Sequence, residues 1–455
     1  MLRSRLTFLF VFITLTACTN FTPPDQFLVI SHPDGSLFVG DQVSFEVLIP
    51  GSPANPNSSI KVEYNGNELG TANISPYGIG GRRQATLLWV WDTRNLKPGN
   101  YNLVFTHLPD NFTWTETFSL HPKAQVPMPE PDAHWVTSTT VCCNLYYISD
   151  TAAARDITIL GQEADIQSAA VSGQFGASLK ERINITIMSR VVGQGGFTNN
   201  GIYVSYLDDN YIGNDMPILF HHEFVHYYDR NLGGSYLPAI LEEGLAVYLT
   251  GGHFKPERLG PRAAALLELG WYIPLTTIAD DFYIQQHDIS YLEAGSLVQY
   301  LVETFGWEKF NKYYRSIPVP QNQTIAAVID LALQNDFGIS LFDLERAYLS
   351  YLHSQTVTAD ERTDLQQTVS FFDTVRRYQE AFDPSSYFLS AWLPDGSVMR
   401  QRGIVADFLR HPNGWKNRLL ESMLIRSHNE LFRGDYPNTE STLKWTNWTM
   451  EVINP

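Results

Sequence analysis

Cysteine is scarce in this sequence. Only three cysteines occur among 455 residues, and two of them, Cys142 and Cys143, are adjacent. Adjacent cysteines cannot tie distant segments together, so a fold stapled by disulfides is excluded, as is a zinc ribbon built from paired cysteines. In an oxidising compartment the two can form a vicinal disulfide, and two partly buried free thiols are the alternative. The fold must therefore rely on an apolar core.

Positive charge is also in short supply. The chain has 31 Lys and Arg residues against 48 Asp and Glu residues, which gives a formal net charge of -17 at pH 7. A surplus of negative charge repels phosphates and anionic headgroups, so nucleic acid and anionic membrane surfaces are not expected as partners. The charge mainly predicts good solubility.

Long apolar runs are missing beyond the N-terminus. After Leu6–Leu15, no stretch approaches the roughly 18 apolar residues that a transmembrane helix needs. Two arginines precede this run, and the sequence Leu-Thr-Ala-Cys that ends at Cys18 resembles the lipobox of bacterial lipoproteins. We therefore expect a signal peptide over residues 1–17, lipidation of Cys18, and an exported protein that meets the membrane of the cell envelope through this anchor only. An ordinary cleaved secretory signal is the alternative.

Short alternating apolar runs separated by turns fill residues 25–122. Examples are Val43-Phe45-Val47, Leu87-Trp89-Trp91 and Tyr101-Leu103-Phe105. Side chains that alternate with a period of two are typical of strands, and their regular spacing predicts a β-sandwich. The segment Leu96–Tyr101 resembles the turn-into-strand signature of bacterial immunoglobulin-like modules, which implies a spacer or adhesion module.

The rest of the chain changes character twice. Residues 123–133 are rich in proline and predict a linker. Residues 134–355 begin as mixed α and β structure, with strands expected at 145–148, 183–188 and 202–206 and a helix at 151–175. Residues 356–455 predict a helical C-terminal region. The expected fold class is therefore multidomain: an N-terminal immunoglobulin-like β-sandwich, a central α+β domain and a C-terminal all-α region.

The strongest chemical signal is the sequence His-Glu-Phe-Val-His at His222–His226. Residues four apart lie on one face of a helix, so His222 and His226 can bind a single metal ion. Glu223 lies one residue further round and can act as the general base toward a water molecule at that metal. The pattern is typical of zinc hydrolases.

A carboxylate downstream can complete the donor set. The segment Glu242–Ala246, with the sequence Glu-Glu-Gly-Leu-Ala, follows after a short loop. One glutamate from it can be the third ligand, which leaves the fourth tetrahedral position open, as a catalytic zinc ion requires. Glu242 and Glu243 fall on different helix faces, so only one of them is expected to bind. The sequence therefore predicts a site for one Zn2+ ion.

These segments resemble the gluzincin metallopeptidases, the group that includes thermolysin and the aminopeptidase N type enzymes. In aminopeptidase-like members the third ligand is the Glu before Gly in a segment of the form Asn-Glu-Gly-Phe-Ala, which places this role on Glu243. The segment that begins at Tyr291 resembles the tyrosine segment of these enzymes, whose phenol donates a hydrogen bond to the oxyanion. The resemblance implies a gluzincin-type central domain with His222 and His226 as further ligands and with Glu223 and Tyr291 as catalytic residues.

The sequence also departs from the family pattern. The exopeptidases have a Gly-X-Met-Glu-Asn motif that binds the substrate amino terminus, and none precedes His222, which favours an endopeptidase over an aminopeptidase. In that stretch we expect Ile202–Tyr206 to be an edge strand that pairs with an extended peptide. The Asp that thermolysin-like enzymes place four residues after the glutamate ligand is Val247 here. A hydrogen-bond partner for the zinc histidines must come from elsewhere, and Asp229 is a candidate.

Three other histidines receive less specific interpretations. His221 points about 100° away from its neighbour in the motif and is expected beside the site or at the surface. His253 can line the cleft, but a loop histidine is more often solvated. His287 lies one turn before Tyr291 and can assist it, although a histidine at a helix entry is more often a surface residue.

The sequence thus predicts a zinc-dependent peptidase that hydrolyses peptide bonds of a peptide or protein substrate outside the cytoplasm. The main alternative is a catalytically inactive, peptidase-like lipoprotein that acts as a surface binding or scaffold module. The retention of Glu223 beside both histidines argues against it, because a pure zinc clamp needs no general base. Hydrolysis of a non-peptide amide is a third possibility, since zinc chemistry does not itself choose the substrate.

Overall fold

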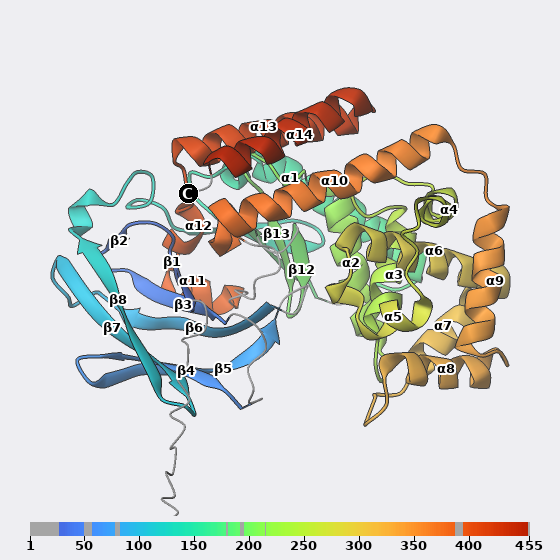
Figure 1. The fold of residues 1–455 in the computed structure, drawn as a ribbon, viewed down its shortest axis with the longest axis horizontal. Helices are drawn as coiled ribbons and strands as arrows, with labels where there is room; N and C mark the ends of the chain where they lie inside the picture. Colours follow the sequence, from blue (N-terminus) through green and yellow to red (C-terminus); the bar gives the residue numbers. More distant parts are fainter. Residues whose placement is uncertain are drawn as a thin grey trace, which may run out of the picture.

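The computed structural model shows a multidomain chain with an N-terminal β-sheet part and a large helical region (Figure 1). The predicted signal peptide and the lipidation site at Cys18 lie outside the residues that the structure describes. Those residues are 27–49, 57–77, 82–178, 181–191, 195–213, 215–386 and 395–453.

The N-terminal part is one curved sheet of eight strands. They are β1 (Leu28–His32), β2 (Leu37–Phe38), β3 (Gln42–Leu48), β4 (Ser59–Tyr64), β5 (Asn67–Tyr77), β6 (Arg82–Asp92), β7 (Gly99–Leu108) and β8 (Phe112–His121). Their order across the sheet is β1-β3-β6-β5-β4-β7-β8-β2. The long β5 pairs with β4 at one end and with β6 at the other, so the sheet curls over itself. Phe45 of β3 therefore meets Phe105 of β7 edge to face, with ring centroids 5.5 Å apart.

Trp89 departs from the alternation predicted for its strand. The register between β3 and β6 shifts between Val43 and Phe45, and Trp89 itself has a φ of 50°. Such an irregularity changes the direction of a side chain. The Trp89 indole Nε1 donates a hydrogen bond to Asp407 Oδ2 at 3.1 Å, in the short helix α12 (Ala406–Leu409). One aromatic side chain thus leaves the core of the sheet and contacts the C-terminal helices.

A second sheet of five strands follows. Its strands are β9 (Trp135–Thr139), β10 (Cys143–Ile148), β11 (Ile183–Met188), β12 (Gly196–Thr198) and β13 (Ile202–Ser205). The order is β12-β13-β11-β10-β9, with β10, β11 and β13 parallel and both edge strands antiparallel to their neighbours. Helix α1 (Ala152–Phe175) connects β10 to β11, as the sequence predicted. Cys142 and Cys143, at the start of β10, form a vicinal disulfide.

The prediction that Ile202–Tyr206 forms an edge strand is wrong. This segment contains β13, which lies inside the sheet between β11 and β12. Among the described strands, the edge on this side of the sheet is β12, and it packs against helix α2 (Met216–Leu232), which contains the His-Glu motif. A strand of three residues is too short to show an alternating pattern, so periodicity could not reveal it.

Helices make up most of the remaining chain. The first group is α2, α3 (Ala239–Thr250), α4 (Leu259–Leu269), α5 (Leu275–Asp280), η2 (Phe282–Ile284), α6 (His287–Phe305), α7 (Trp307–Ser316), α8 (Ile325–Asp336) and α9 (Leu341–Ser354). The second is α10 (Ala359–Phe382), η3 (Pro384–Ser386), α11 (Gly396–Arg402), α12, α13 (Trp415–Phe432) and α14 (Tyr436–Ile453). In Figure 1 the long α10 extends from the first group toward the paired helices α13 and α14. In the part of the chain that the structure describes, no single helix has the length and apolarity to span a membrane, and α8 and α9 meet that test only as a pair bent by 84°.

Helices α3 and α6 cross with their backbones in near contact. A Cβ atom on Gly244 of α3 would lie 2.5 Å from the carbonyl oxygen of Ala294, and one on Gly295 of α6 would lie 2.4 Å from Val247 Cγ1. Both distances are shorter than real Cβ contacts, so only glycine fits at these two positions. The crossing fixes the separation of the helices that contain Glu243 and Tyr291.

Buried ion pairs connect the N-terminal sheet to the helical region. The Arg410 guanidinium contacts Asp41 Oδ2 at 2.6 Å and Glu130 Oε1 at 2.5 Å. Glu130 belongs to residues 123–133, which also contain the short helix η1 (Lys123–Gln125). All three charged groups are largely shielded from solvent, so the ion pairs join the start of β3, the proline-rich segment and the chain after α12.

Candidate metal centre

Helix α2 has ordinary start and stop signals on both sides of its buried motif. The side chain of Asp215 caps its N-terminus by accepting a hydrogen bond from the Ile218 backbone N–H, and a proline occupies the first turn. The helix ends at Gly233, which has a φ of 85°. His222, Glu223 and His226 all lie on its buried face. The local sequence thus places the motif inside the protein.

Three donor atoms converge between α2 and α3. The Nε2 atoms of His222 and His226 lie 3.0 Å apart, and Glu243 Oε2 lies 3.3 Å from the first and 3.0 Å from the second. The sequence predicted these three residues as ligands, and they form a buried group that could hold a metal ion. Two imidazole nitrogens and one carboxylate oxygen are donor types that divalent transition metals bind.

The electrostatics of this cluster favour positive charge at its centre. Burial by itself lowers the pKa of His226, but the nearby carboxylates, Glu243 above all, together outweigh burial and raise that pKa to about 9. Burial by itself raises the pKa of Glu243, but the charge of His226 and hydrogen bonds from both histidines bring it well below its usual value. Atoms this close stabilise a proton or a metal ion between them. The donor set therefore fits a metal ion.

The structure distinguishes the two adjacent glutamates. Glu242 does not face the converging donors: its Oε1 lies 3.8 Å from His226 Nδ1, on the opposite side of that ring, and 2.8 Å from Arg230 Nε. Glu243 alone reaches the Nε2 atoms of the histidines. At 3.8 Å, Glu242 is too far from His226 Nδ1 for a hydrogen bond, and its carboxylate is paired with Arg230 instead.

Asp229 does not serve the histidines. Its carboxylate accepts a hydrogen bond from Tyr314 at 2.7 Å and forms an ion pair with Arg315 at 2.5 Å. Both partners belong to α7, so Asp229 connects α2 to that helix. Asp229 was a candidate for orienting His226 because it lies one helical turn away. Instead, residues of α7 bind both of its carboxylate oxygens, and sequence spacing could not reveal these partners.

The candidate base Glu223 is buried against the edge strand β12. Its Oε2 accepts a hydrogen bond from Thr198 Oγ1 at 2.7 Å. Burial raises the pKa of Glu223, whereas the histidines and the Thr198 bond lower it, and the pKa remains above its ordinary value. Gly196 of β12 leaves little room here, because a Cβ atom on it would lie 3.1 Å from Glu223 Oε1. Nothing in the local sequence of β12 indicated this contact.

Tyr291 lies near the donor cluster, within a group of aromatic rings. Its ring centroid is 6.1 Å from that of His222 and 4.1 Å from those of both His253 and His287. Burial raises the pKa of Tyr291 well above 10, and the charge of Glu243 raises it further. The phenol therefore keeps its proton at neutral pH and remains a hydrogen-bond donor.

We expected His253 and His287 to be solvated, because residues in loops and at helix entries usually are. Neither is exposed in the structure. His287 is only 3 % exposed, and His253 is partly buried. Burial, together with neighbouring positive charge, lowers the pKa of His253 to about 3 and lowers that of His287 well below its usual value. With Asp288 they form a second group whose ligand atoms lie within 4.8 Å of one another. The Asp288 carboxylate already faces a cation, the Arg376 guanidinium at 3.6 Å.

His221 is turned toward α1. Its two ring nitrogens lie 2.7 Å from Gln167 Oε1 and 3.0 Å from Gln174 Oε1. The rotation of about 100° between adjacent helical residues accounts for this direction. His221 therefore connects two helices and takes no part in the donor cluster.

Sequence reasoning missed one further contact at the cluster. Tyr283, in η2, donates a hydrogen bond from its phenol to Glu243 Oε1 at 2.7 Å. Tyr283 and Glu243 come from different elements, and no local spacing links them. A buried carboxylate needs hydrogen-bond donors, so the sequence could indicate that Glu243 has such a partner. It could not indicate which residue the partner is.

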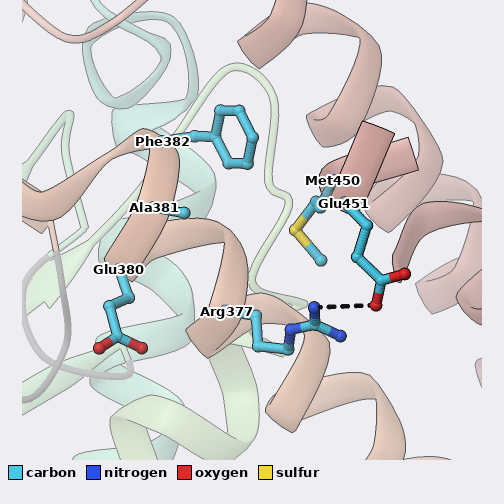
Figure 2. A pocket seen from close by; sticks show the side chains of 6 residues that line it. All are labelled: Arg377, Glu380, Ala381, Phe382, Met450 and Glu451. Carbon is cyan, nitrogen blue, oxygen red and sulfur yellow. Dashed lines mark hydrogen bonds and ion pairs between the residues drawn. The ribbon is translucent and has the colours of Figure 1, made fainter. Parts of the chain in front are cut away.

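The molecule also has a separate surface cavity of about 470 Å3 between α10 and α14 (Figure 2). Its rim includes Arg377 and Glu451, which form an ion pair at 3.4 Å. The full lining is Arg377, Glu380, Ala381, Phe382, Met450 and Glu451. None of these residues belongs to either of the two clusters that could hold a metal ion, so the cavity is not part of the candidate metal centre.

The sequence matches no protein-family model and no curated protein. Among solved structures, the chain is similar to an aminopeptidase N family protein from Idiomarina loihiensis, with 12% sequence identity and a TM-score of 0.22. The similarity covers 72% of this chain and 70% of that chain.

Proposed function

We propose that this protein is a zinc-dependent peptidase of the gluzincin type. The observation that supports this proposal is the convergence of His222, His226 and Glu243, with the carboxylate of Glu223 next to them. Two imidazoles and one carboxylate are the protein ligands of many catalytic zinc ions. When bound there, zinc supplies a Lewis acid that polarises a carbonyl group and lowers the pKa of water toward about 7.

Three residues of the chain then have distinct roles in the proposed hydrolysis. Glu223 accepts the proton of the attacking water and delivers it to the nitrogen of the leaving amine. Thr198 fixes the Glu223 carboxylate through its hydroxyl group. Tyr291 donates its phenol hydrogen to the oxygen that gains charge as water attacks, because a preorganised donor lowers the cost of that charge. The high pKa of Tyr291 keeps this donor in place.

The position of β12 favours an extended peptide as the substrate. An edge strand can pair with an extended chain through backbone hydrogen bonds, and β12 is the edge strand next to α2. The amino-terminus-binding motif of the exopeptidases is missing from the sequence, so an endopeptidase remains slightly favoured. The proposal includes export, a lipid anchor at Cys18 and an immunoglobulin-like spacer over residues 25–122.

The test compares zinc-loaded wild-type protein with the Glu223→Gln variant on a library of peptides. We expect the variant to bind one zinc ion per chain and to cleave at least about a hundredfold more slowly, because it lacks the base. Glutamine keeps the size of the side chain and an oxygen that can accept the Thr198 hydrogen bond. Zinc content measured by elemental analysis shows whether the site is intact.

Two outcomes would contradict the proposal in different ways. Equal cleavage by both proteins would show that Glu223 is not the base. A wild-type protein that binds zinc but cleaves nothing would point to the inactive scaffold instead. The His222→Ala variant is the matched control, because it should lose zinc and activity together.

A further inference from the structure

The two oxygens of the Glu243 carboxylate have different surroundings. Oε2 faces the Nε2 atoms of His222 and His226, at 3.3 and 3.0 Å. Oε1 accepts the phenol hydrogen of Tyr283 at 2.7 Å. One oxygen is thus directed toward the converging nitrogens, and the other is held by a residue that comes from a different element.

Tyr283 is held in place by its neighbours on both sides. Phe282 is buried and meets the Tyr283 ring edge to face at 5.1 Å, and it also contacts the Tyr291 ring at 5.1 Å. After η2, the side chain of Gln286 caps α6 by accepting a hydrogen bond from the Ile289 backbone N–H. The segment therefore has a packed residue and a helix cap that hold it against the donor cluster.

Tyr283 is placed at the boundary between the cluster and solvent. Its side chain is 36 % exposed, yet its hydroxyl group points inward to Glu243. A phenol ordinarily keeps its proton at neutral pH, so this hydroxyl group acts as a donor, and the negative charge of its acceptor strengthens the hydrogen bond.

A carboxylate can bind a metal through one oxygen or through both. A strong hydrogen bond to one oxygen fixes the plane of the carboxylate and makes that oxygen a poorer ligand, so the other oxygen binds alone. Binding through a single oxygen also leaves a coordination position open for water, which a catalytic site needs. Partners that hold a ligand in this way affect metal affinity by about 10- to 100-fold.

We propose that Tyr283 is a positioning residue that holds Glu243 in a single-oxygen binding mode at the metal centre. The inference rests on the proposed function, because it assumes that a metal ion binds between the two histidines and Glu243. Tyr283 itself touches neither the substrate nor the metal in this role, which separates it from the proposed role of Tyr291.

The test measures zinc affinity by competition with a chelator for three full-length proteins: the wild type, Tyr283→Phe and Tyr272→Phe. The control is closely matched, because the Tyr272 hydroxyl donates to the Glu345 carboxylate at 3.0 Å, away from the donor cluster. We expect the dissociation constant for zinc to rise about 10- to 100-fold in Tyr283→Phe. It should change less than about twofold in Tyr272→Phe, since the metal ligands keep their partners.

The visible absorption of the cobalt-substituted proteins gives a second readout that a loss of stability alone would not change. If the carboxylate of Tyr283→Phe binds through both oxygens, the coordination number rises, and the cobalt absorption weakens relative to the wild type and to Tyr272→Phe. Equal zinc affinity and equal spectra in all three proteins would overturn the inference and leave the proposed function intact. A wild-type protein that binds no zinc would overturn both, and equal losses in the two variants would overturn the inference by pointing to general destabilisation.

Discussion

The proton affinity of Glu223 results from effects that oppose each other. Burial raises its pKa, and the positive character of the neighbouring histidines and the hydrogen bond from Thr198 lower it. Such tuning matters for a general base, because it must be deprotonated at working pH and still accept a proton readily. Thr198, a residue of the edge strand, thus helps to set the pH at which the proposed enzyme becomes active.

Replacing Thr198 with valine should move the acidic limb of the pH–rate profile. Removing the bond raises the pKa of Glu223 further, and the base is inactive when protonated, so activity should be lost at a higher pH than in the wild type. A hydrogen bond to a charged group contributes roughly 1.5 to 3 kcal/mol, so we expect a shift of about one to two pH units in kcat/KM.

The exposed Thr117 of β8 offers a control, because Thr117→Val makes the same chemical change far from the site. Its pH profile should match that of the wild type. An unchanged profile in Thr198→Val, or a shift toward lower pH, would contradict the assigned role of the threonine.

At the residue scale, the sequence predicted the members of the donor cluster but not the residues that hold them. His222 and His226 follow from helical periodicity, and Glu243 follows from its pairing with glycine in a resembling motif. Thr198 and Tyr283 act across gaps between elements, and their partners lie far away in the sequence. The periodicity of apolar residues shows which face of a single helix or strand is buried, so it cannot identify contacts between two elements.

At the element scale, the crossing of α3 and α6 gives a physical reason for the glycine beside Glu243. Gly244 lies against the backbone of Ala294, and Gly295 lies against the side chain of Val247. Helices that approach this closely fix the positions of the side chains next to the contact. The crossing therefore positions both Glu243 and Tyr291.

The Gly295→Ala variant should separate these helices. The added methyl group has no room, so we expect a loss of about 1 to 3 kcal/mol in the free energy of unfolding, measured with a denaturant, and weaker zinc binding. Gly173→Ala on α1 is the matched control, because a Cβ atom there would meet nothing within 4 Å. It should leave zinc binding unchanged and stabilise the protein by up to about 1 kcal/mol through helix propensity. Equal effects of the two substitutions would refute the close crossing.

The elements themselves were predicted with uneven success. Strands β10 and β11 and helix α1 were expected within about two residues of their observed bounds, because each has a clear apolar pattern. The edge strand was assigned to Ile202–Tyr206 because that predicted strand lies in the stretch where the exopeptidases have their amino-terminus-binding motif. Strong apolar character in fact indicated a strand buried inside the sheet, and the true edge, β12, is short and contains a glycine.

At the scale of the whole molecule, Asp407 carries a buried carboxyl group where α12 meets the N-terminal sheet. Burial raises its pKa to about 6, although the charge of His32 and the hydrogen bond from Trp89 oppose this rise. The folded pKa is therefore higher than the ordinary value of 3.8. The folded protein binds a proton that the unfolded chain releases, so stability falls as the pH rises from about 4 to about 6.

The Asp407→Asn variant should remove this dependence, because an amide does not titrate and its oxygen can still accept the Trp89 hydrogen bond. Near pH 8 we expect it to be more stable than the wild type by at most about 3 kcal/mol, at about 1.4 kcal/mol per pKa unit. Near pH 3.5 the advantage should have largely disappeared. Thermal unfolding across this range provides the measurement, and Asp208→Asn at an exposed position is the control. A variant that is less stable than the wild type at pH 8 would contradict the assignment.

Composition shifts along the sequence indicated an N-terminal β part and a helical C-terminal region, and the structure has both. The contacts between them were not predictable. Trp89 and Asp407 meet although they are 318 residues apart, and the strand pattern around Trp89 placed it in the core of its own sheet. A local irregularity of the strand decides its direction, and binary patterning does not encode it.

The Arg410 ion pairs bear on how far the candidate site can travel. If the linker between the N-terminal sheet and the helical region were flexible, the distance between that sheet and the candidate site would vary over a wide range. Detaching Glu130 and Asp41 from a buried guanidinium leaves uncompensated charge, at a cost of several kcal/mol. The proline-rich segment therefore acts as a rigid joint, and the candidate metal centre stays at a fixed distance from β1. The proposed peptidase would accordingly reach only substrates that come within that one distance.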